Sequence, residues 1–304
     1  MDDYLLRPIA KLREEGWSDR RLRAAIANGE LARPVRSIYG EPRELSGKDA
    51  HLARARGILM RQGTSVALSH VTAAIVHGLS VSDNDPGDVH LTVPPPARGH
   101  KRSGYHVHVA PLTEEDVTEV GGVRVTSLAR TAADLARGVQ FTWGVIAMDH
   151  AMRRGVTRAE LDRVVEAASR RSGVETLRSV VEFADGRSQS AAESASRVTM
   201  ARAGLPAPVM QFRVDDSSDW IAACDFGWPD HGVVGEVDGE AKYDERIARG
   251  ASAGKVVREQ QDRDELIRQC GWWPTHWGWA LAWDVQGLGD RIRGAFEAAR
   301  GSTH

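Results

Sequence analysis

The C-terminal third of the chain has an order of apolar segments that few folds accommodate. The spacing predicts a helix, three strands, a second helix and a fourth strand, at residues 190–203, 209–214, 221–226, 233–237, 256–270 and 272–277. This order is typical of an α/β layer structure in which helices cover a sheet. Because the pattern changes after Gly186, we expect a separate domain to begin there.

Acidic residues lie where these strands would bring them together. Asp225 ends one predicted strand, Glu236 lies on its hairpin partner, and Asp238 shares a strand face with Glu236 because side chains alternate. Glu193 approaches from the preceding helix. Clustered carboxylates repel unless a cation lies between them, and oxygen ligands of this kind suit Mg²⁺. We expect a magnesium site here, with Lys242 orienting a water or neutralising charge on a scissile phosphate.

Each of these acidic residues also has a plainer interpretation. Ser190 and Glu193 have the spacing of a helix capping box, so Glu193 could serve only its own helix. Asp238 before Gly239 is typical of a turn. Asp225 could face solvent on an edge strand.

The first forty residues have a different pattern. Apolar residues recur at helical spacing over residues 3–15, and Ser18 is a good N-cap for a second helix over residues 18–28. Residues 31–40 then indicate a short β-hairpin. Helix, turn, helix and hairpin is the order of a winged helix-turn-helix domain.

Arginines are placed where such a domain meets DNA. Arg20, Arg21 and Arg23 lie in the first turns of the second helix, where a recognition helix reads base edges. Arg33 and Arg36 lie in the hairpin, where they could hold phosphates. The alternative is a solvated basic face on a small helical domain.

Charge is distributed unevenly along the chain. Residues 1–62 carry 13 basic and 9 acidic residues, residues 63–185 carry 13 and 15, and residues 186–304 carry 14 and 18, so the net charge of −2 is a cancellation. A basic head and an acidic tail favour different partners for the two ends. Random fluctuation is the alternative, since an excess of four charges is modest.

Composition excludes several classes of protein. Two cysteines are too few for a disulfide framework or a four-thiolate zinc site. The longest apolar stretches are far shorter than the ~20 residues that a membrane span needs, and the acidic N-terminus lacks the pattern of a signal peptide. We therefore expect a cytoplasmic protein without a membrane segment.

The middle of the chain is predicted to be an α+β region. Helices are expected at 48–62, 66–79 and within 142–184, and strands at 89–93 and 105–109. Six of the eleven histidines fall between His70 and His108. His106 and His108 would share one face of a strand, as zinc ligands sometimes do, but no histidine pair has convincing helical spacing, which favours surface or hydrogen-bonded histidines.

Tryptophan is concentrated near the end of the chain. Five of the nine tryptophans fall within residues 272–283. They could stack on unpaired bases or pack a sheet against its helices, and packing is favoured. Pro274 within the last predicted strand indicates an edge strand, because proline cannot donate a ladder hydrogen bond.

Two groups of motifs resemble AbiEi-type antitoxins of type IV toxin–antitoxin systems. They are residues 16–23, 29–33 and 38–40 at the N-terminus, with residues 69–74 and 130–135 farther on. The resemblance covers about residues 1–137. It implies a DNA-binding winged helix and a cognate toxin or other protein partner.

The C-terminal segment resembles the restriction-endonuclease-like PD-(D/E)xK superfamily, close to Vsr-like endonuclease domains. The matching residues are 190–194, 204–206, Gln211, 225–229, 234–239, Arg263 and 271–272. The resemblance implies that Glu193, Asp225 and Glu236 bind the metal. Asp238 departs from the family, since lysine usually stands there, and Lys242 occupies a place where many Vsr-like relatives have histidine.

These expectations combine into a multidomain α/β chain. A winged helix-turn-helix domain over residues 1–45 would be followed by an antitoxin-like α+β region over 46–185 and an endonuclease-fold domain over 186–304. The function expected is a DNA-binding protein with a Mg²⁺-dependent endonuclease domain, in a defence or toxin–antitoxin context. The alternative is a non-catalytic, antitoxin-like transcriptional regulator with a degenerate nuclease fold.

Overall fold

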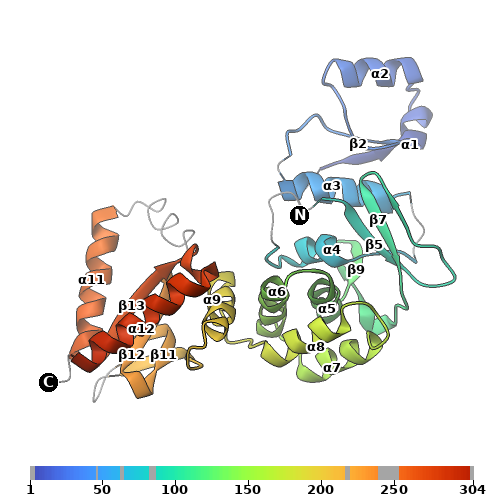
Figure 1. The fold of residues 1–304 in the computed structure, drawn as a ribbon. Helices are drawn as coiled ribbons and strands as arrows, with labels where there is room; N and C mark the ends of the chain where they lie inside the picture. Colours follow the sequence, from blue (N-terminus) through green and yellow to red (C-terminus); the bar gives the residue numbers. More distant parts are fainter. Residues whose placement is uncertain are drawn as a thin grey trace. The chain divides into compact units, whose positions relative to one another are not determined.

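The computed structural model describes residues 4–45, 47–61, 65–81, 87–215, 220–238 and 253–301. This part of the chain is a mixed α/β protein with three sheets (Figure 1). It divides into two compact units, residues 1–139 with 156–178 and residues 140–155 with 179–304. No helix in the described ranges combines the length and the apolar character that crossing a bilayer requires.

The first unit begins with a small antiparallel sheet in the order β1-β3-β2. Its elements are β1 (Leu6–Pro8), α1 (Ile9–Glu14), α2 (Asp19–Ala27), β2 (Ala32–Val35) and β3 (Ile38–Gly40). The second predicted helix and the hairpin are confirmed. Ser18 is the N-cap of α2, and its Oγ accepts a hydrogen bond from the backbone N–H of Arg21 at 3.2 Å.

The expected helix over residues 3–15 is wrong at its start. Leu6–Pro8 form β1, which pairs with β3, and the helix begins only at Ile9. Proline disfavours a helical conformation in the residue before it, so Arg7 adopts an extended backbone. Pro8 then occupies the N-cap position of α1.

A single glycine lets the next helix approach this small sheet. A Cβ atom at Gly57 of α3 (Gly47–Leu59) would lie 2.7 Å from Cγ2 of Val35, closer than real Cβ contacts come. The absence of a side chain at Gly57 therefore allows α3 to pack against β2. α3 also contributes Ala55 and Ile58 to the core of the larger sheet.

The larger sheet has the order β6-β7-β5-β4-β9-β8. Its strands are β4 (Ala67–Leu68), β5 (Val89–Val93), β6 (His100–Arg102), β7 (Tyr105–Val109), β8 (Val117–Val120) and β9 (Val123–Thr126). The strands predicted at 89–93 and 105–109 are confirmed. The helix predicted over 66–79 is shorter, since β4 precedes α4 (His70–His77), and periodicity cannot assign so short an apolar run.

A buried ion-pair network holds the helices of the first unit together. In α5 (Leu128–Gly138), Arg130 Nε lies 2.9 Å from Asp134 Oδ2, and Arg130 also contacts Asp116 at 3.2 Å. Arg163 of α7 (Arg158–Ala167) reaches Asp116 at 3.0 Å, and Arg137 contacts Asp134 at 2.8 Å. The motif at residues 130–135, which contains Arg130 and Asp134, is therefore a structural feature of this layer. α8 (Val174–Phe183) follows α7.

The second unit has a four-stranded sheet in the order β10-β11-β12-β13, in which β12 and β13 are parallel and the other pairs antiparallel. Its elements are α6 (Phe141–Arg153), α9 (Ala191–Arg202), β10 (Val209–Asp215), β11 (Trp220–Trp228), β12 (Val233–Asp238), α11 (Ala253–Gln269), β13 (Trp273–Gly278) and α12 (Val285–Gly301). The predicted order of helix, three strands, helix and strand is confirmed, and β13 is an edge strand. α12 was not predicted from the sequence.

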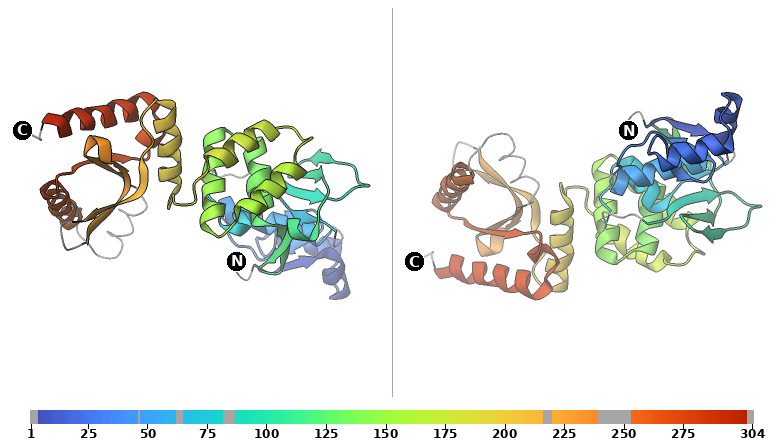
Figure 2. Two further views of the ribbon diagram at one scale, coloured as in Figure 1. Left: turned by 90° about the horizontal axis from the view of Figure 1, so that it is seen from below. Right: turned by 90° about the horizontal axis from the view of Figure 1, so that it is seen from above.

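Helices cover both faces of this sheet (Figure 2). Residues of α9 and α12 share one core with Phe226 and Trp277, whereas Ile267 of α11 packs on the other face against Val234. Trp277 is buried, stacks on Phe226 with 5.4 Å between ring centroids, and donates its indole N–H to Ser196 Oγ at 2.8 Å. The packing role expected for the tryptophan cluster is confirmed for Trp277.

Removing one carboxylate from the buried network should destabilise the first unit strongly. The side chains of Asp134 and Arg130 are 1% and 5% exposed. We expect Asp134→Ala to lower the free energy of unfolding by about 3–5 kcal/mol, because it leaves buried guanidinium groups without their counter-charge. Urea unfolding followed by far-UV circular dichroism measures this free energy.

Asp162→Ala is the matched control, since Asp162 pairs with Arg158 while both side chains are more than 60% exposed. This substitution should cost less than about 1 kcal/mol. Equal losses in the two variants would contradict the role assigned to the network.

Candidate functional site

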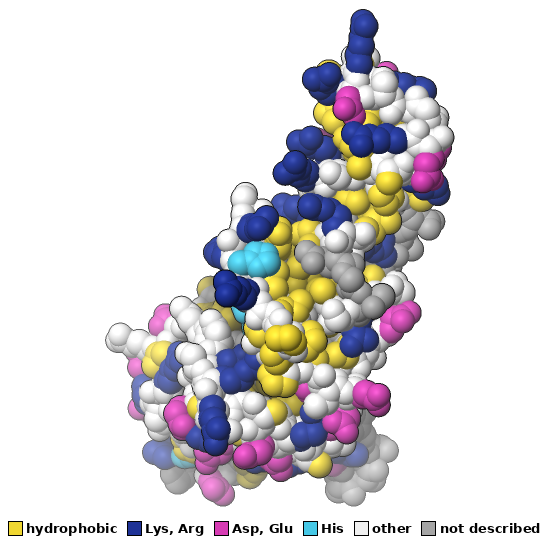
Figure 3. Space-filling view, turned by 90° about the vertical axis from the view of Figure 1, so that its right-hand side faces the viewer, with side chains coloured by type: hydrophobic (Ala, Val, Ile, Leu, Met, Phe, Trp, Pro, Cys, Tyr) yellow, Lys and Arg dark blue, Asp and Glu magenta, His cyan; other side chains and the backbone are white. Residues whose placement is uncertain are grey.

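The five arginines predicted to contact DNA are all exposed. Arg20, Arg21 and Arg23 lie on α2, and Arg33 and Arg36 lie on the β2–β3 hairpin. None of them takes part in an ion pair with another residue in the described ranges. Lys and Arg side chains are frequent over the N-terminal part of the face in Figure 3. The charges of the five arginines are therefore available to an anionic partner.

The guanidinium of Arg21 is oriented by a tryptophan. Its Cζ lies 4.0 Å from the ring centroid of Trp17, which is within the range of a cation–π contact. Trp17 in turn packs against the small core formed by Leu12 and Leu22. This contact holds the arginine at the start of α2 while leaving it exposed.

Glu193 lies in a cap at the start of α9. Its side chain is buried, and its Oε1 accepts from Ser190 Oγ at 2.9 Å. Its Oε2 accepts from the Gln189 backbone N–H at 2.8 Å and from Gln211 Nε2 at 2.9 Å. The capping interpretation is confirmed in part. Ser190 Oγ accepts the Glu193 backbone N–H at 3.1 Å, as a helix cap does, but the Glu193 carboxylate binds the N–H of Gln189 where a full capping box would use that of Ser190.

Gln211 also contributes to this region, through a backbone conformation that the sequence does not indicate. Its φ is +50°, in the left-handed region that residues other than glycine rarely adopt. On either side of it the strand changes face, since Met210 belongs to the core under α9 and α12 whereas Phe212 packs with the core under α11. The kink directs the Gln211 amide to Glu193.

Asp225 and Glu236 lie on neighbouring strands. Extending the β11–β12 register by one pair beyond Phe226 and Gly235 places them opposite each other. Asp225 Oδ2 accepts the backbone N–H of Val237 at 2.9 Å. Glu236 Oε1 forms an ion pair with Arg263 of α11 at 2.5 Å. The predicted juxtaposition of these two carboxylates is therefore present, and both already have partners.

The environment of Glu236 opposes its ionisation. Burial raises the pKa of Glu236, and the nearby charge of Asp225 raises it further, while Arg263 and His276 act in the opposite direction. Two carboxylates facing each other favour a cation between them. At Glu236 the guanidinium of Arg263 supplies that cation.

The three predicted metal ligands do not converge as a group. Among the described residues one set of three metal-ligating side chains has atoms within 4.8 Å of one another, and Glu193, Asp225 and Glu236 are not that set. Asp238 is exposed at the end of β12. Lys242 lies outside the residues that the structure describes.

The set that does converge consists of His70, His90 and His108 in the first unit. The pair expected from the sequence, His106 and His108, does share a strand face, with 3.9 Å between the ring centroids. The converging set was not predicted, because its members come from α4, β5 and β7. No spacing along the chain indicates that set, since it depends on the pairing of the strands.

A known protein family matches the middle of the chain. The family described as AbiEi antitoxin C-terminal domain matches residues 65–183. This range includes the motifs at 69–74 and 130–135. Residues 16–40 and 186–285 lie outside it, so the winged helix and the Vsr-like resemblance stay predictions.

Two proteins of Mycobacterium tuberculosis are similar over most of the chain. MT2308 of strain CDC 1551 / Oshkosh and Rv2248 of strain H37Rv, both described as uncharacterized, are 28% identical over 250 residues, covering 81% of this chain and 85% of each relative. The crystal structure of the RV2827C protein from Mycobacterium tuberculosis aligns with a TM-score of 0.43 and 16% identity, over 70% of this chain and 84% of that one.

The capping role of Glu193 can be measured as stability. Glu193→Ala leaves the Gln189 N–H and the Gln211 amide without their acceptor, so we expect it to lower the free energy of unfolding by about 1–3 kcal/mol. Tryptophan fluorescence during urea unfolding reports on the second unit, which contains eight of the nine tryptophans. Glu297→Ala, at an exposed position of α12, is the control and should stay within about 0.5 kcal/mol of the parent. A loss at Glu193 no larger than at Glu297 would exclude the cap as its role.

Proposed function

We propose that this chain is a DNA-binding regulator of the antitoxin type, acting in a toxin–antitoxin or abortive-infection system. The family match over residues 65–183 supports the antitoxin context. The observation that carries the DNA-binding part is the set of five exposed arginines on α2 and the β2–β3 hairpin, without ion-pair partners among the described residues.

In this proposal the N-terminal elements form a winged helix-turn-helix. α2 acts as the recognition helix, and Arg20, Arg21 and Arg23 approach base edges or phosphates in the major groove. Arg33 and Arg36 hold the backbone from the wing. Pro34 fits this arrangement, since β2 is an edge strand of the small sheet and proline is tolerated there.

A cognate toxin is the second partner that we propose. The proposal rests on the family match, whose description names an antitoxin. Regulation would then follow from two binding events on one chain, one to DNA through the N-terminal elements and one to a protein.

A second candidate function is Mg²⁺-dependent DNA hydrolysis by the second unit. The order of α9, β10, β11, β12, α11 and β13 supports it, as does the position of Asp225 opposite Glu236. In that case Glu193, Asp225 and Glu236 would hold the metal, with Asp238 and Lys242 beside them. Oxygen ligands of this kind suit Mg²⁺. The ion pair of Glu236 with Arg263 and the cap formed by Glu193 favour the regulator instead.

The first test addresses DNA binding. The double variant Arg20→Ala, Arg21→Ala removes two cations from α2, so its affinity for a labelled random-sequence duplex should fall. On a random-sequence duplex we expect both side chains to contact phosphates, so the slope of log K against log salt should become shallower by roughly 1.8, because each lost phosphate contact contributes about 0.9. Fluorescence anisotropy at several salt concentrations measures both quantities.

The matched control removes the same charge elsewhere. Arg291→Ala with Arg300→Ala takes two exposed arginines from α12 in the second unit. This variant should keep the salt slope of the parent. If both double variants lower the slope equally, binding is a property of total charge, and α2 is not the recognition helix.

The second test separates the regulator from the nuclease. Plasmid and single-stranded DNA are incubated with the purified protein in Mg²⁺, Mn²⁺ or EDTA, beside Asp225→Ala and Glu236→Ala. If the chain is a regulator, the parent protein should show no metal-dependent cleavage that is lost in Asp225→Ala or Glu236→Ala. Cleavage that requires both the metal and Asp225 would establish the nuclease instead.

A further inference from the structure

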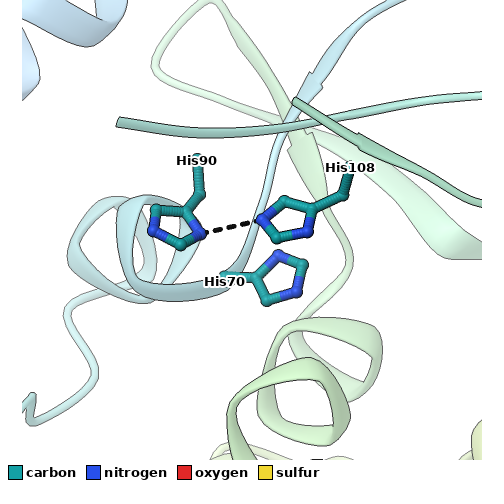
Figure 4. A group of neighbouring side chains, drawn as sticks. All are labelled: His70, His90 and His108. Carbon is teal, nitrogen blue, oxygen red and sulfur yellow. Dashed lines mark hydrogen bonds between the residues drawn. The ribbon is translucent and has the colours of Figure 1, made fainter. Parts of the chain in front are cut away.

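Three histidines from separate elements meet in the first unit (Figure 4). His70 begins α4, His90 lies on β5 and His108 lies on β7, and one ring nitrogen of each lies within 4.8 Å of the other two. We propose that these three side chains bind a divalent transition-metal ion of the zinc class. The proposal is independent of DNA binding and of the carboxylates of the second unit.

Main-chain hydrogen bonds fix the histidines relative to one another. The Ser69 N–H donates to the carbonyl of His90 at 3.0 Å, and the His90 N–H donates to Thr72 Oγ1 at 2.8 Å. The start of α4 is thereby tied to β5 on both sides of His70. The parallel register of β5 and β7 then sets His108 beside Thr92. A site whose ligands are held by rigid elements in this way is pre-organised for an ion.

His70 has a strained backbone. Its φ is +51°, in the left-handed region that residues other than glycine occupy only at a cost in backbone strain. Its ring is also oriented, because Ser69 Oγ lies 3.0 Å from Nδ1. Strain that the surrounding structure maintains is concentrated at functional sites, and here it turns the imidazole toward the other two.

The rings are held in the form that binds metals. Burial lowers the pKa of His70 and His90 to about 4 and that of His108 to about 3, and in each case neighbouring histidines add to the effect. At neutral pH each ring therefore has one nitrogen lone pair. The contact between His90 Nδ1 and His108 Nε2 at 2.9 Å, dashed in Figure 4, joins one donor and one acceptor. A tautomer change frees both nitrogens without releasing a proton.

The ligand set selects the class of ion. Three neutral imidazoles suit Zn²⁺ and its first-row neighbours, whereas Mg²⁺ requires oxygen ligands. A tetrahedral zinc with bonds of about 2.0–2.1 Å separates its ligand nitrogens by roughly 3.3 Å, which small ring rotations reach. Three protein ligands leave one position for water or another ligand. Thr92 Oγ1, on the same strand face as His90, is buried and has no hydrogen-bond partner among the described residues.

The rival explanation is a neutral histidine cluster held by stacking and hydrogen bonds alone. The rings of His70 and His108 do stack, with centroids 3.9 Å apart. Metal titration distinguishes the two explanations. Full-length, tag-free protein is stripped with EDTA, dialysed and titrated with Co²⁺, whose visible absorption is intense in a tetrahedral site. Zn²⁺ is then added as a competitor, and bound zinc is quantified by mass spectrometry after gel filtration.

We expect about one Co²⁺ per chain, displaced by Zn²⁺ and unaffected by excess Mg²⁺. His70→Ala, His90→Ala and His108→Ala should each lose the absorption band and weaken binding more than roughly 10-fold. His100→Ala is the control, because His100 is an exposed histidine on the adjacent strand β6. Asp225→Ala with Glu236→Ala should also bind like the parent, which separates this site from the carboxylates.

A measurement on the parent protein covers the case in which a histidine variant does not fold. X-ray absorption at the zinc edge should give three nitrogen neighbours from imidazole at about 2.0–2.1 Å. The proposal is overturned if the parent binds no Co²⁺ or Zn²⁺ after gel filtration. It is equally overturned if folded His70, His90 and His108 variants keep the parent's affinity, or if the absorption spectrum shows carboxylate ligands alone.

Discussion

The buried charges of Asp134 and Asp116 determine how the first unit is assembled. Each carboxylate is almost completely buried, and each is neutralised by arginines from the helical layer. A buried carboxylate without such partners would cost several kcal/mol, so α5 and α7 can pack together only in the register that pairs these groups. Burial alone would raise the pKa of Asp134, yet Arg130 and Arg137, which are charged at neutral pH, hold that pKa below its ordinary value. The pairing therefore remains intact at neutral pH.

Hydrogen bonds connect this helical layer to the larger sheet. Ser127, the N-cap of α5, donates its N–H to the Asp116 carbonyl at 2.8 Å, which joins the helix to the segment before β8. His77 contacts the Thr126 carbonyl at 2.7 Å and joins α4 to β9. At the other end of α4, hydrogen bonds of Ser69 and Thr72 with His90 hold the first turn on β5. The position of His70 therefore depends on contacts at both ends of its helix.

Much of this fold could be predicted from periodicity, because long amphipathic segments carry their own signal. The order of helix and strands in the second unit, the cap at Ser18 and the edge position of Pro274 all follow from local rules. The short strands β1 and β4 were missed for an identifiable reason. β1 has three residues and β4 has two, and β1 is stabilised by pairing with β3, thirty residues away along the chain. Local sequence patterns do not indicate which distant segments pair as strands.

The same limit explains the outcome at the candidate sites. Exposure of the arginines on α2 follows from the apolar face set by Leu22 and Ala25, so it could be inferred from sequence. The ion-pair partner of Glu236 could not be inferred from sequence, because Arg263 lies 27 residues later, on a different element. The histidine set depends on a parallel strand pair and a left-handed residue, and neither leaves a spacing that can be recognised along the chain.

The two groups of metal-capable side chains differ in what an ion would have to displace. Around Glu236 a guanidinium already balances the negative charge, so Mg²⁺ must compete with a bound cation and with its own reluctance to lose water. Around His70, His90 and His108 the rings are neutral, and an ion displaces one hydrogen bond between two of them. Coordination replaces that hydrogen bond with three metal–nitrogen bonds. The strands already order the ligand side chains, so little conformational entropy is lost when the ion binds. The charge of Arg263 thus opposes binding of Mg²⁺ at the carboxylates, whereas the fixed positions of the three histidines favour binding of an ion such as Zn²⁺.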